Sequence, residues 1–242
     1  MKLFLPLLLL FAVIACKKEA PIVPDITTGL VMNIALDGNA YDSVNAISGI
    51  VSKVNPYFNR HNEPNKSMLF NRNDSSTIDF GDLDAASFPT NQFTISCWIN
   101  VPDTIAPMTV LSKRGEFGPW EYSLDNHFNH AVFNLDNWVQ DGSTTVYGVD
   151  PLKASATFQL NTWQHFTYVA DGTSLRVYLN GVLQPGEDVY KTGFFLQNTT
   201  AHFIIGNGGG YGKNYYFDGC IDDIRIYNYP LDATTIQYLA GL

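Results

Sequence analysis

The sequence predicts an all-β protein, a two-sheet antiparallel β-sandwich of the jelly-roll type with one short C-terminal helix. Three features of the composition favour this class: aromatic residues make up 14% of the chain, charged residues only 15%, and turn formers are frequent, with 19 Gly and 12 Pro. Aromatic side chains pack well on pleated surfaces, whereas glycine and proline belong in the turns between strands. The sequence contains no long amphipathic helix and no internal repeat.

The clearest strand is predicted at residues 93–101, where Phe93, Ile95, Cys97 and Ile99 alternate with Thr94, Ser96, Trp98 and Asn100. A period of two indicates a pleated strand with two different faces. Segments 163–171 and 174–179 are predicted to form a hairpin around Asp171-Gly172-Thr173, which is a turn sequence. Further strands are expected at 30–36, 67–70, 77–80, 109–113, 121–125, 131–135, 144–149, 182–184, 203–206 and 217–227.

The predicted helix is 232–239, with Asp232 as N-cap because its carboxylate can accept from free amides of the first turn. Trp98 and Trp163 lie in the two strongest strands among apolar neighbours, and we expect both in the core. Cys97 and Cys220 fall in different predicted strands. A disulfide between them and two buried free thiols both remain open, because sequence does not place the strands side by side.

The N-terminus resembles the signal of a bacterial lipoprotein. Lys2 precedes a short apolar run, and Cys16 directly follows Val13-Ile14-Ala15. That run is too short to cross a bilayer as a stable helix. The resemblance implies a signal peptide at 1–15, lipidation of Cys16, a lipidated tether at 16–28 and one domain at 29–242. An exported chain that is lipid-anchored to the cell envelope, with the outer membrane as the expected membrane, follows from it.

The net charge argues against nucleic acid as a partner. The formal charge is −9 at pH 7, with 14 Lys and Arg against 23 Asp and Glu. An acidic surface repels phosphate backbones, and no basic patch stands out in the sequence.

Five segments in order resemble the LamG-like jelly-roll domains of the concanavalin A-like lectin/glucanase superfamily. They are LVMNIALDGNAYDSVN (30–45), FTISCWINVPD (93–103), TVLSK (109–113), TWQHFTYVADGTSLRVYLNGVLQ (162–184) and FDGCIDDIRIYNYPLDATTIQYL (217–239). The resemblance covers residues 29–242 and is specific for the fold. It does not specify a ligand, because one fold hosts many functions.

Two groups of oxygen-bearing residues suggest a structural calcium ion. Asp37, Asn39 and Asp42 are close in sequence, and Asp222-Asp223 lie near the C-terminus. Calcium takes six to eight oxygen ligands. In the resembled family a calcium ion often ties the N-terminal loop to the last strand, which implies pairing across these groups. The alternative is that Asp37 and Asp42 cap turns by accepting backbone amides.

Aromatic and polar residues outside the family-like segments are the candidate ligand-binding residues. Trp120 and Trp138 could stack on sugar rings, and Asn134 and Asp136 could bind hydroxyl groups. An apolar platform beside a few polar groups is usual for a small-molecule site. The alternative for the two tryptophans is that they plug the ends of the sandwich.

No catalytic residues are assigned. Glycosidases of this broad fold use paired carboxylates, but the alternating run of acids found in the glucanase branch is absent here, and Glu121 and Asp125 lack its spacing. The expected function is therefore non-catalytic binding of carbohydrate at the cell envelope. A glycan hydrolase or lyase with an unfamiliar acid/base pair, and an adhesion module that binds protein, remain as alternatives.

Overall fold

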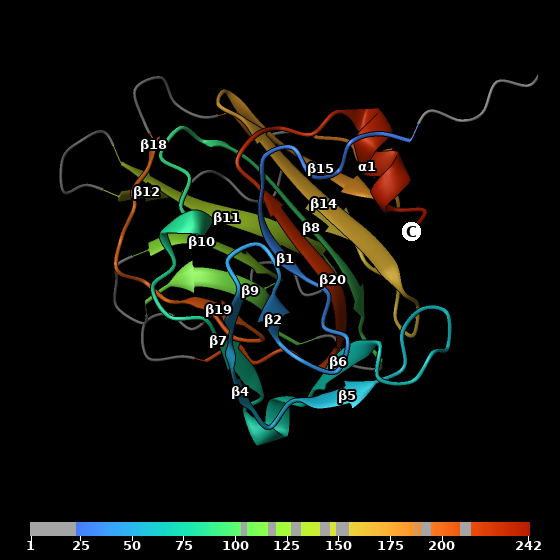
Figure 1. Cartoon of the computed structure of the whole chain (residues 1–242). Coiled ribbons are helices and arrows are strands. Elements are labelled where there is room, and N and C mark those ends of the chain that lie inside the picture. The colour runs from blue at the N-terminus through green and yellow to red at the C-terminus, as the bar shows by residue number, and fades with distance from the viewer. Residues whose placement is uncertain are drawn as a thin grey trace, which may run out of the picture.

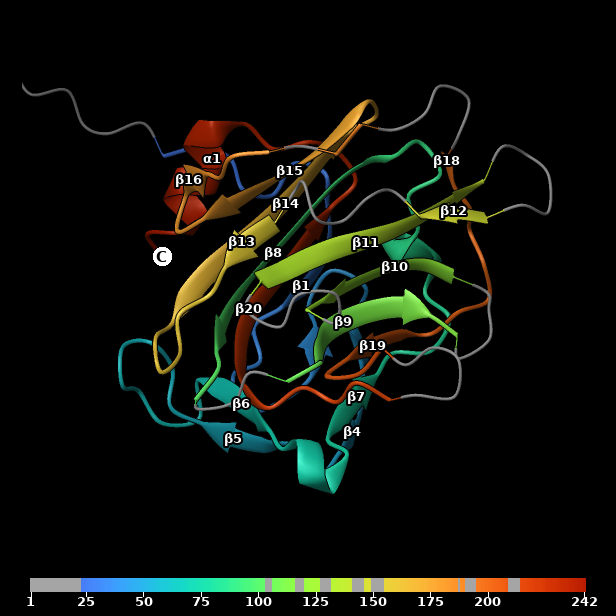
Figure 2. The ribbon, with the colours of Figure 1, turned by 180° about the vertical axis from the view of Figure 1, so that it is seen from behind.

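The computed structural model describes residues 23–102, 106–115, 120–126, 132–140, 146–148, 155–186, 188–189, 195–208 and 214–242. Within them the chain forms two antiparallel sheets that pack face to face, as Figures 1 and 2 show from opposite sides. The predicted all-β sandwich is confirmed. The predicted signal peptide and Cys16 lie outside the described residues.

Sheet A contains eleven of the described strands, in the order β16-β15-β14-β8-β20-β1-β2-β3, with β17 beside β15 and the β5–β6 hairpin beside β20. Its strands are β1 Leu30–Ile34, β2 Tyr41–Asp42, β3 Ile47–Ser48, β5 Asn55–Tyr57, β6 Ser67–Phe70, β8 Gln92–Asn100, β14 Gln164–Asp171, β15 Ser174–Leu179, β16 Val182–Leu183, β17 Asp188–Val189 and β20 Gly219–Tyr227.

Sheet B contains nine of the described strands, in the order β12-β11-β10-β9-β19-β7-β4, with β13 and β18 paired to β11. Its strands are β4 Ile50–Ser52, β7 Thr77–Asp79, β9 Thr109–Arg114, β10 Trp120–Asp125, β11 Val132–Gln140, β12 Val146–Gly148, β13 Ser155–Thr157, β18 Phe195–Leu196 and β19 Phe203–Ile205. The described helices are η1 Arg72–Asp74, η2 Asp84–Ala86 and α1 Ala233–Leu239.

The core lies between the sheets and follows the period-two pattern of the sequence. On β8, Phe93, Ile95 and Cys97 are fully buried, and they belong to one continuous apolar cluster with residues of both sheets. On β15, Leu175 and Val177 are buried in the same cluster. Alternation places every second residue of a strand on this inner face, so the remaining positions form the outer faces of the two sheets.

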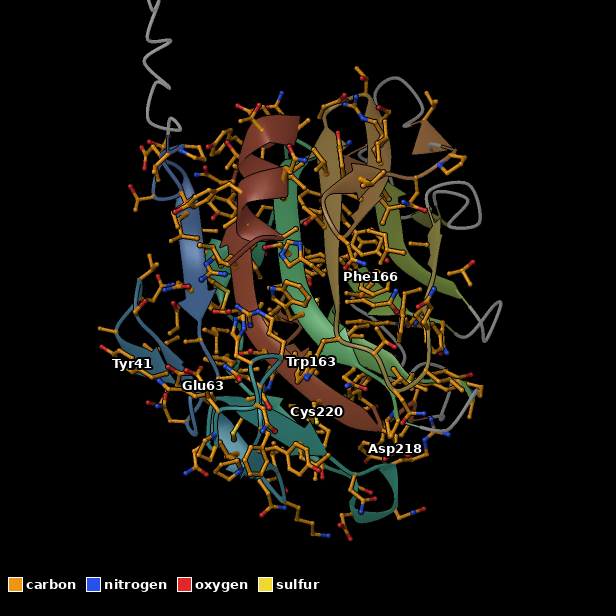
Figure 3. All side chains as sticks on the ribbon, turned by 90° about the vertical axis from the view of Figure 1, so that its right-hand side faces the viewer. Tyr41, Glu63, Trp163, Phe166, Asp218 and Cys220 are labelled. Atoms are coloured by element: carbon orange, nitrogen blue, oxygen red, sulfur yellow. The ribbon has the colours of Figure 1, made fainter. Side chains whose placement is uncertain are left out.

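The predicted hairpin turn at Asp171 and the predicted helix N-cap at Asp232 are confirmed. The β14–β15 hairpin turns at Asp171, whose Oδ1 accepts from the backbone amides of Thr173 at 2.9 Å and Ser174 at 2.8 Å. Helix α1 is capped by Asp232, whose Oδ1 accepts from Thr235 N at 2.7 Å. Ile236 and Leu239 of α1 pack on a second apolar cluster on the outer face of sheet A, over which the helix lies in Figure 3.

The prediction that Trp98 and Trp163 belong to the core is wrong. Trp98 alternates with Cys97 and Ile99, so it lies on the outer face of sheet A, half-buried, with its ring 5.2 Å from that of His165. Trp163 immediately precedes β14 and is also half-buried (Figure 3). An apolar ring in a strand indicates burial, but sequence does not say that the outer face of the sheet is itself covered.

Cys97 and Cys220 are free thiols on opposite faces of sheet A. Cys97 is in the core between the sheets, whereas Cys220 precedes the core residue Ile221 and faces the other way. No described helix is long and apolar enough to span a membrane.

Candidate functional site

A pocket of about 310 Å³ opens on sheet B where β9, β19 and the segment after β19 meet. We call it the β9–β19 pocket. Its described lining combines side-chain hydroxyls, carboxamides, a guanidinium and an imidazole with some apolar surface, contributed by Ser112, Arg114, Gly115, Thr200, Ala201, His202, Ile204, Asn207, Gly208 and Asn214. A few convergent polar groups in a concave site are the usual anatomy of a binding site for a small molecule.

The strand register explains why these residues converge. Phe203 and Ile205 of β19 are fully buried in the core, so Ile204 lies on the outer face between them. Ile204 pairs with Ser112 of β9. Residues that face each other in an antiparallel pair share one side of the sheet, so the hydroxyl of Ser112 and the side chain of Ile204 form the floor of the pocket.

The segment after β19 folds back on β9. The Ser112 hydroxyl donates to the carbonyl of Asn207 at 2.8 Å, and the Thr109 hydroxyl donates to the carbonyl of Gly208 at 3.4 Å. A Cβ at Gly208 would lie 2.5 Å from Thr109 Cγ2, so only glycine permits this close approach. Gly208 belongs to the glycine-rich run GNGGGYGKN (206–214), and this contact explains why glycine is needed at that position.

Two side chains of the rim are held by neighbours. The amide of Asn207 donates to Oδ1 of Asn214 at 3.2 Å and its Oδ1 accepts from Tyr215 N at 3.2 Å. Nδ1 of His202 lies 3.0 Å from the Asp79 carboxylate. Because Nδ1 contacts Asp79, Nε2 is the ring nitrogen of His202 that a ligand can use.

The four sequence-predicted ligand residues lie on β10 and β11, beside this pocket in the same sheet. Trp120 pairs with Arg114, a lining residue. Asp136 pairs with Ser123, which in turn pairs with Ser112, so the three positions form one row across β11, β10 and β9.

Asn134 pairs with Asp125, and Trp138 pairs with Gly148 of β12. The expected strand end at residue 135 is wrong, since β11 continues to Gln140. The side chains of Trp120, Asn134, Asp136 and Trp138 lie outside what the structure describes. Sequence reasoning predicted strands at β9, β10, β11 and β19, but it did not identify the pocket-lining residues on β9 and β19 as site candidates.

Comparison with known proteins settles the family. A family model described as the concanavalin A-like lectin/glucanases superfamily matches residues 72–237. The chain belongs to this lectin/glucanase superfamily. The predicted resemblance is therefore confirmed, whereas no curated protein matches the sequence.

Several solved structures share the fold. Domain 4 of AbnA, an extracellular GH43 arabinanase from Geobacillus stearothermophilus in complex with arabinotriose, has a TM-score of 0.63 at 18% identity, over 87% of this chain and 98% of that chain. A Trypanosoma rangeli sialidase mutant with trans-sialidase activity has a TM-score of 0.60 at 17% identity, over 88% of this chain and 33% of that one.

The binding domain of botulinum neurotoxin DC in complex with rat synaptotagmin II has a TM-score of 0.62 at 14% identity, over 90% of this chain and 52% of that one. The chain thus spans about a third of the sialidase and half of the toxin domain. At these identities the likeness shows the fold, which enzymes and binding modules share.

Glu121 and Asp125, the two acids considered for catalysis in this lectin/glucanase chain, are both engaged by neighbouring residues. Glu121 is fully buried, and its Oε1 lies 3.0 Å from Lys113 Nζ and 2.9 Å from Thr199 N. Lys113 also contacts Asp82 at 3.0 Å. Asp125 is fully buried and accepts from the Ser123 hydroxyl. No carboxylate is among the described lining residues of the β9–β19 pocket.

The two C-terminal acids of the predicted calcium site bind an arginine. Nη1 of Arg60 lies 2.7 Å from Oδ2 of Asp222, and Nη2 lies 2.9 Å from Oδ2 of Asp223. The register of β20 against β8 shifts between Asp222 and Arg225, and Asp223 has φ +50°. This bulge turns two consecutive carboxylates toward one guanidinium.

The N-terminal members of that predicted site are engaged separately. Asp37 pairs with Lys66 at 2.7 Å. Asp42 accepts from the amides of Asn33 at 2.9 Å and Val44 at 3.0 Å, and Asn39 Oδ1 accepts from Tyr41 N at 2.9 Å.

Turn capping, the alternative weighed for Asp42, is what the structure shows. For Asp37 it shows the ion pair with Lys66 instead. Among the described residues no group of three or more His, Cys, Asp or Glu side chains could hold a metal ion. These residues do not fit the expected calcium ion, because a guanidinium already lies between the two acids.

Burial gives this part of sheet A unusual protonation behaviour. Burial and the neighbouring Asp223 carboxylate raise the pKa of Asp222 to about 7, against the opposing influence of Arg60. Burial, followed by the charges of Arg225 and Arg60, lowers the pKa of His165 to about 3. His165 is fully buried and lies across from Trp98, which in turn pairs with Asp222.

Proposed function

We propose that this lectin/glucanase-fold protein binds glycan without cleaving it, and that the β9–β19 pocket holds the sugar. The observation that carries the proposal is the pocket itself, about 310 Å³ with hydroxyls, carboxamides and an imidazole converging on it. Sugar hydroxyls donate and accept hydrogen bonds, so a site of mixed donors and acceptors on a firm sheet matches their chemistry.

Trp120 and Trp138 complete the proposed site as stacking platforms, with Asn134 and Asp136 as partners for hydroxyls. Their backbone positions on β10 and β11 support this, because Trp120 pairs with the lining residue Arg114 and Asp136 lies in the row of Ser112. A glycan that extends from the pocket along this row would meet Asp136, and the other three positions lie on the same two strands.

The likeness to domain 4 of AbnA supports a binding role, since that domain is in complex with arabinotriose. The buried pairing of Glu121 with Lys113 is the main argument against the hydrolase or lyase alternative. A general acid or base must reach the substrate, and this carboxylate is fully buried and neutralises a fully buried lysine.

We further propose export and lipid anchoring through Cys16, on the strength of the N-terminal sequence alone. Radiolabelled palmitate should enter the full chain in a bacterial host, and Cys16→Ser should abolish its incorporation. Labelling that persists in Cys16→Ser would refute the anchor.

The glycan proposal is tested with a glycan array and isothermal titration of the full chain. Wild type is expected to bind at least one oligosaccharide, and His202→Ala to weaken binding about fivefold, which corresponds to one lost hydrogen bond. His61→Ala is the matched control, because His61 is an exposed histidine in the connection between β5 and β6, which belong to the other sheet. An array without any bound saccharide, or turnover of the bound one, contradicts the proposal.

A further inference from the structure

A second pocket, of about 210 Å³, lies on the outer face of sheet A. Its lining residues are Tyr57, Leu69, Asn100, Pro102, Asn161, Gly219 and Cys220, and we call it the Tyr57 pocket. None of these side chains carries a formal charge at neutral pH. The pocket belongs to the sheet opposite the β9–β19 pocket and shares no residue with it.

The floor of the Tyr57 pocket is one row across three strands. Leu69 of β6 pairs with Cys220 of β20, which pairs with Asn100 of β8. Gly219 allows this packing, because a Cβ there would lie 2.3 Å from the Asn100 carbonyl oxygen and its φ is +139°. Cys220 is labelled near the lower end of the sheet in Figure 3. The floor is therefore part of the rigid sheet.

The walls supply an exposed aromatic ring and two carboxamides. Tyr57 is 46% exposed although it is a large apolar side chain, and its ring lies edge-on to Phe58 at 5.7 Å. Asn161 is held beside Pro102 because its amide donates to the Val101 carbonyl at 2.7 Å. Within the described part of the chain no side-chain hydrogen bond engages the carboxamide of Asn100 or Asn161, so both are available to a ligand.

We propose that the Tyr57 pocket is a second glycan subsite that takes one unit of a neutral saccharide. An exposed ring offers a face for the C–H side of a sugar, and two carboxamides offer paired donors and acceptors for hydroxyls. A pocket of about 210 Å³ is smaller than the usual site for a drug-sized ligand, which suits a single ring or a chain end. An acidic sugar would be buried there without a counter-charge, which is costly.

The experiment is an amide chemical-shift titration of the full chain with arabinotriose, cellotriose and tri-galacturonate. The two neutral probes, at up to about 10 mM so that millimolar affinity is detected, should shift the amides of Asn100, Asn161 and Cys220 saturably. Tri-galacturonate should leave these three amides unchanged. The proposal is overturned if neither neutral probe shifts them, or if the acidic probe does so equally well.

Matched variants distinguish binding in the Tyr57 pocket from binding elsewhere on the surface. Tyr57→Ala should weaken the titration at these amides at least tenfold, whereas Tyr41→Ala, which removes a tyrosine that is 45% exposed on β2, should not. Asn161→Gly should weaken it as well, with Asn65→Gly as control, because both asparagines are exposed with positive φ. Equal loss in test and control variants would refute the assignment.

The outcome is independent of the proposed function. His202→Ala should not change the titration at Asn100 and Cys220, and Tyr57→Ala should not change shifts at Ile204 or Gly208. If the saccharides bind in the β9–β19 pocket but not in the Tyr57 pocket, only the proposal of a second subsite is refuted. If both pockets bind, both proposals stand.

Discussion

Arg60 and Asp222 are 162 residues apart in sequence, yet Nη1 of Arg60 lies 2.7 Å from Oδ2 of Asp222. The same guanidinium contacts Asp223, and its carbon lies 4.7 Å from the centroid of the Trp98 ring. The side chain of Asp222 is 3% exposed and that of Arg60 is 11% exposed. One arginine thus fastens the segment between β5 and β6 to the last strand of the sheet.

Arg60→Ala should destabilise the protein by about 3 kcal/mol. The variant leaves the Asp222 and Asp223 carboxylates without their guanidinium, and breaking a buried ion pair typically costs this much because an uncompensated charge remains. Arg60→Lys should recover only part of the loss, since an ammonium cannot reach two carboxylates in a fork. Urea unfolding measures both. Lys66→Ala removes an exposed pair and should change little; a loss as large as that of Arg60→Ala would contradict this account.

The pH dependence of stability should contain two opposing contributions from this cluster. Asp222 has a folded pKa of about 7, above its usual value, so its contribution is present at low pH and lost as pH rises through 7. His165 has a folded pKa of about 3, below its usual value, so its contribution is present above pH 6.5 and lost as pH falls. The two oppose each other over roughly pH 4 to 6.5.

Replacing one of the two groups should reveal the contribution of the other to the pH dependence of stability. Asp222→Asn should lose stability on acidification more steeply than wild type, and His165→Phe should lose less or gain. Urea unfolding at several pH values across this range tests both slopes. Parallel curves for the two variants and wild type would rule out the shifted pKa values.

Chelation should leave the melting temperature unchanged. A ligand that binds only the folded state stabilises it by mass action, so removal of a resident calcium ion would lower the melting temperature. The five oxygen-bearing residues first considered as ligands are instead bound to Arg60, Lys66 and backbone amides. A drop in the calorimetric melting temperature with excess EDTA, reversed by added Ca²⁺, would restore the calcium ion.

Cys97 and Cys220 should not form a disulfide with each other even under oxidising conditions. Cys220 pairs with Asn100, three residues along β8 from Cys97, and the two thiols face opposite sides of sheet A. A disulfide needs Cα atoms within about 7 Å and converging Cβ vectors. Burial also raises the pKa of Cys97 to about 12, which suppresses the reactive thiolate. Non-reducing peptide mapping should find no 97–220 cross-link, and such a peptide in the native protein would disprove this placement.

Local patterns predicted most of the fold, because they report on interactions between near neighbours. The alternation around Ile95 identified β8, and Asp171 and Asp232 identified a hairpin turn and a helix start. The same alternation places Trp98 on the other face of β8, but it does not show that this face is covered, because the segment that carries Arg60 has no periodicity and reaches sheet A only through the tertiary fold.

The candidate site was predicted in part for the same reason. Trp120 and Asp136 stood out by composition, and their strands do border the β9–β19 pocket. His202 and Ser112 were missed, because they meet only through the pairing of β9 with β19, strands that are far apart in sequence. The glycine-rich run that begins at Gly206 was the available signal, since a residue without a Cβ, such as Gly208, permits close approach to a sheet.

The most direct test of the proposed glycan binding is a crystal structure of the full chain soaked with arabinotriose. The account predicts sugar density in the β9–β19 pocket, with Nε2 of His202 and the Asn214 carboxamide within hydrogen-bond distance of hydroxyl groups. Saturating sugar without density in the β9–β19 pocket, or sugar density confined to another surface, would contradict it.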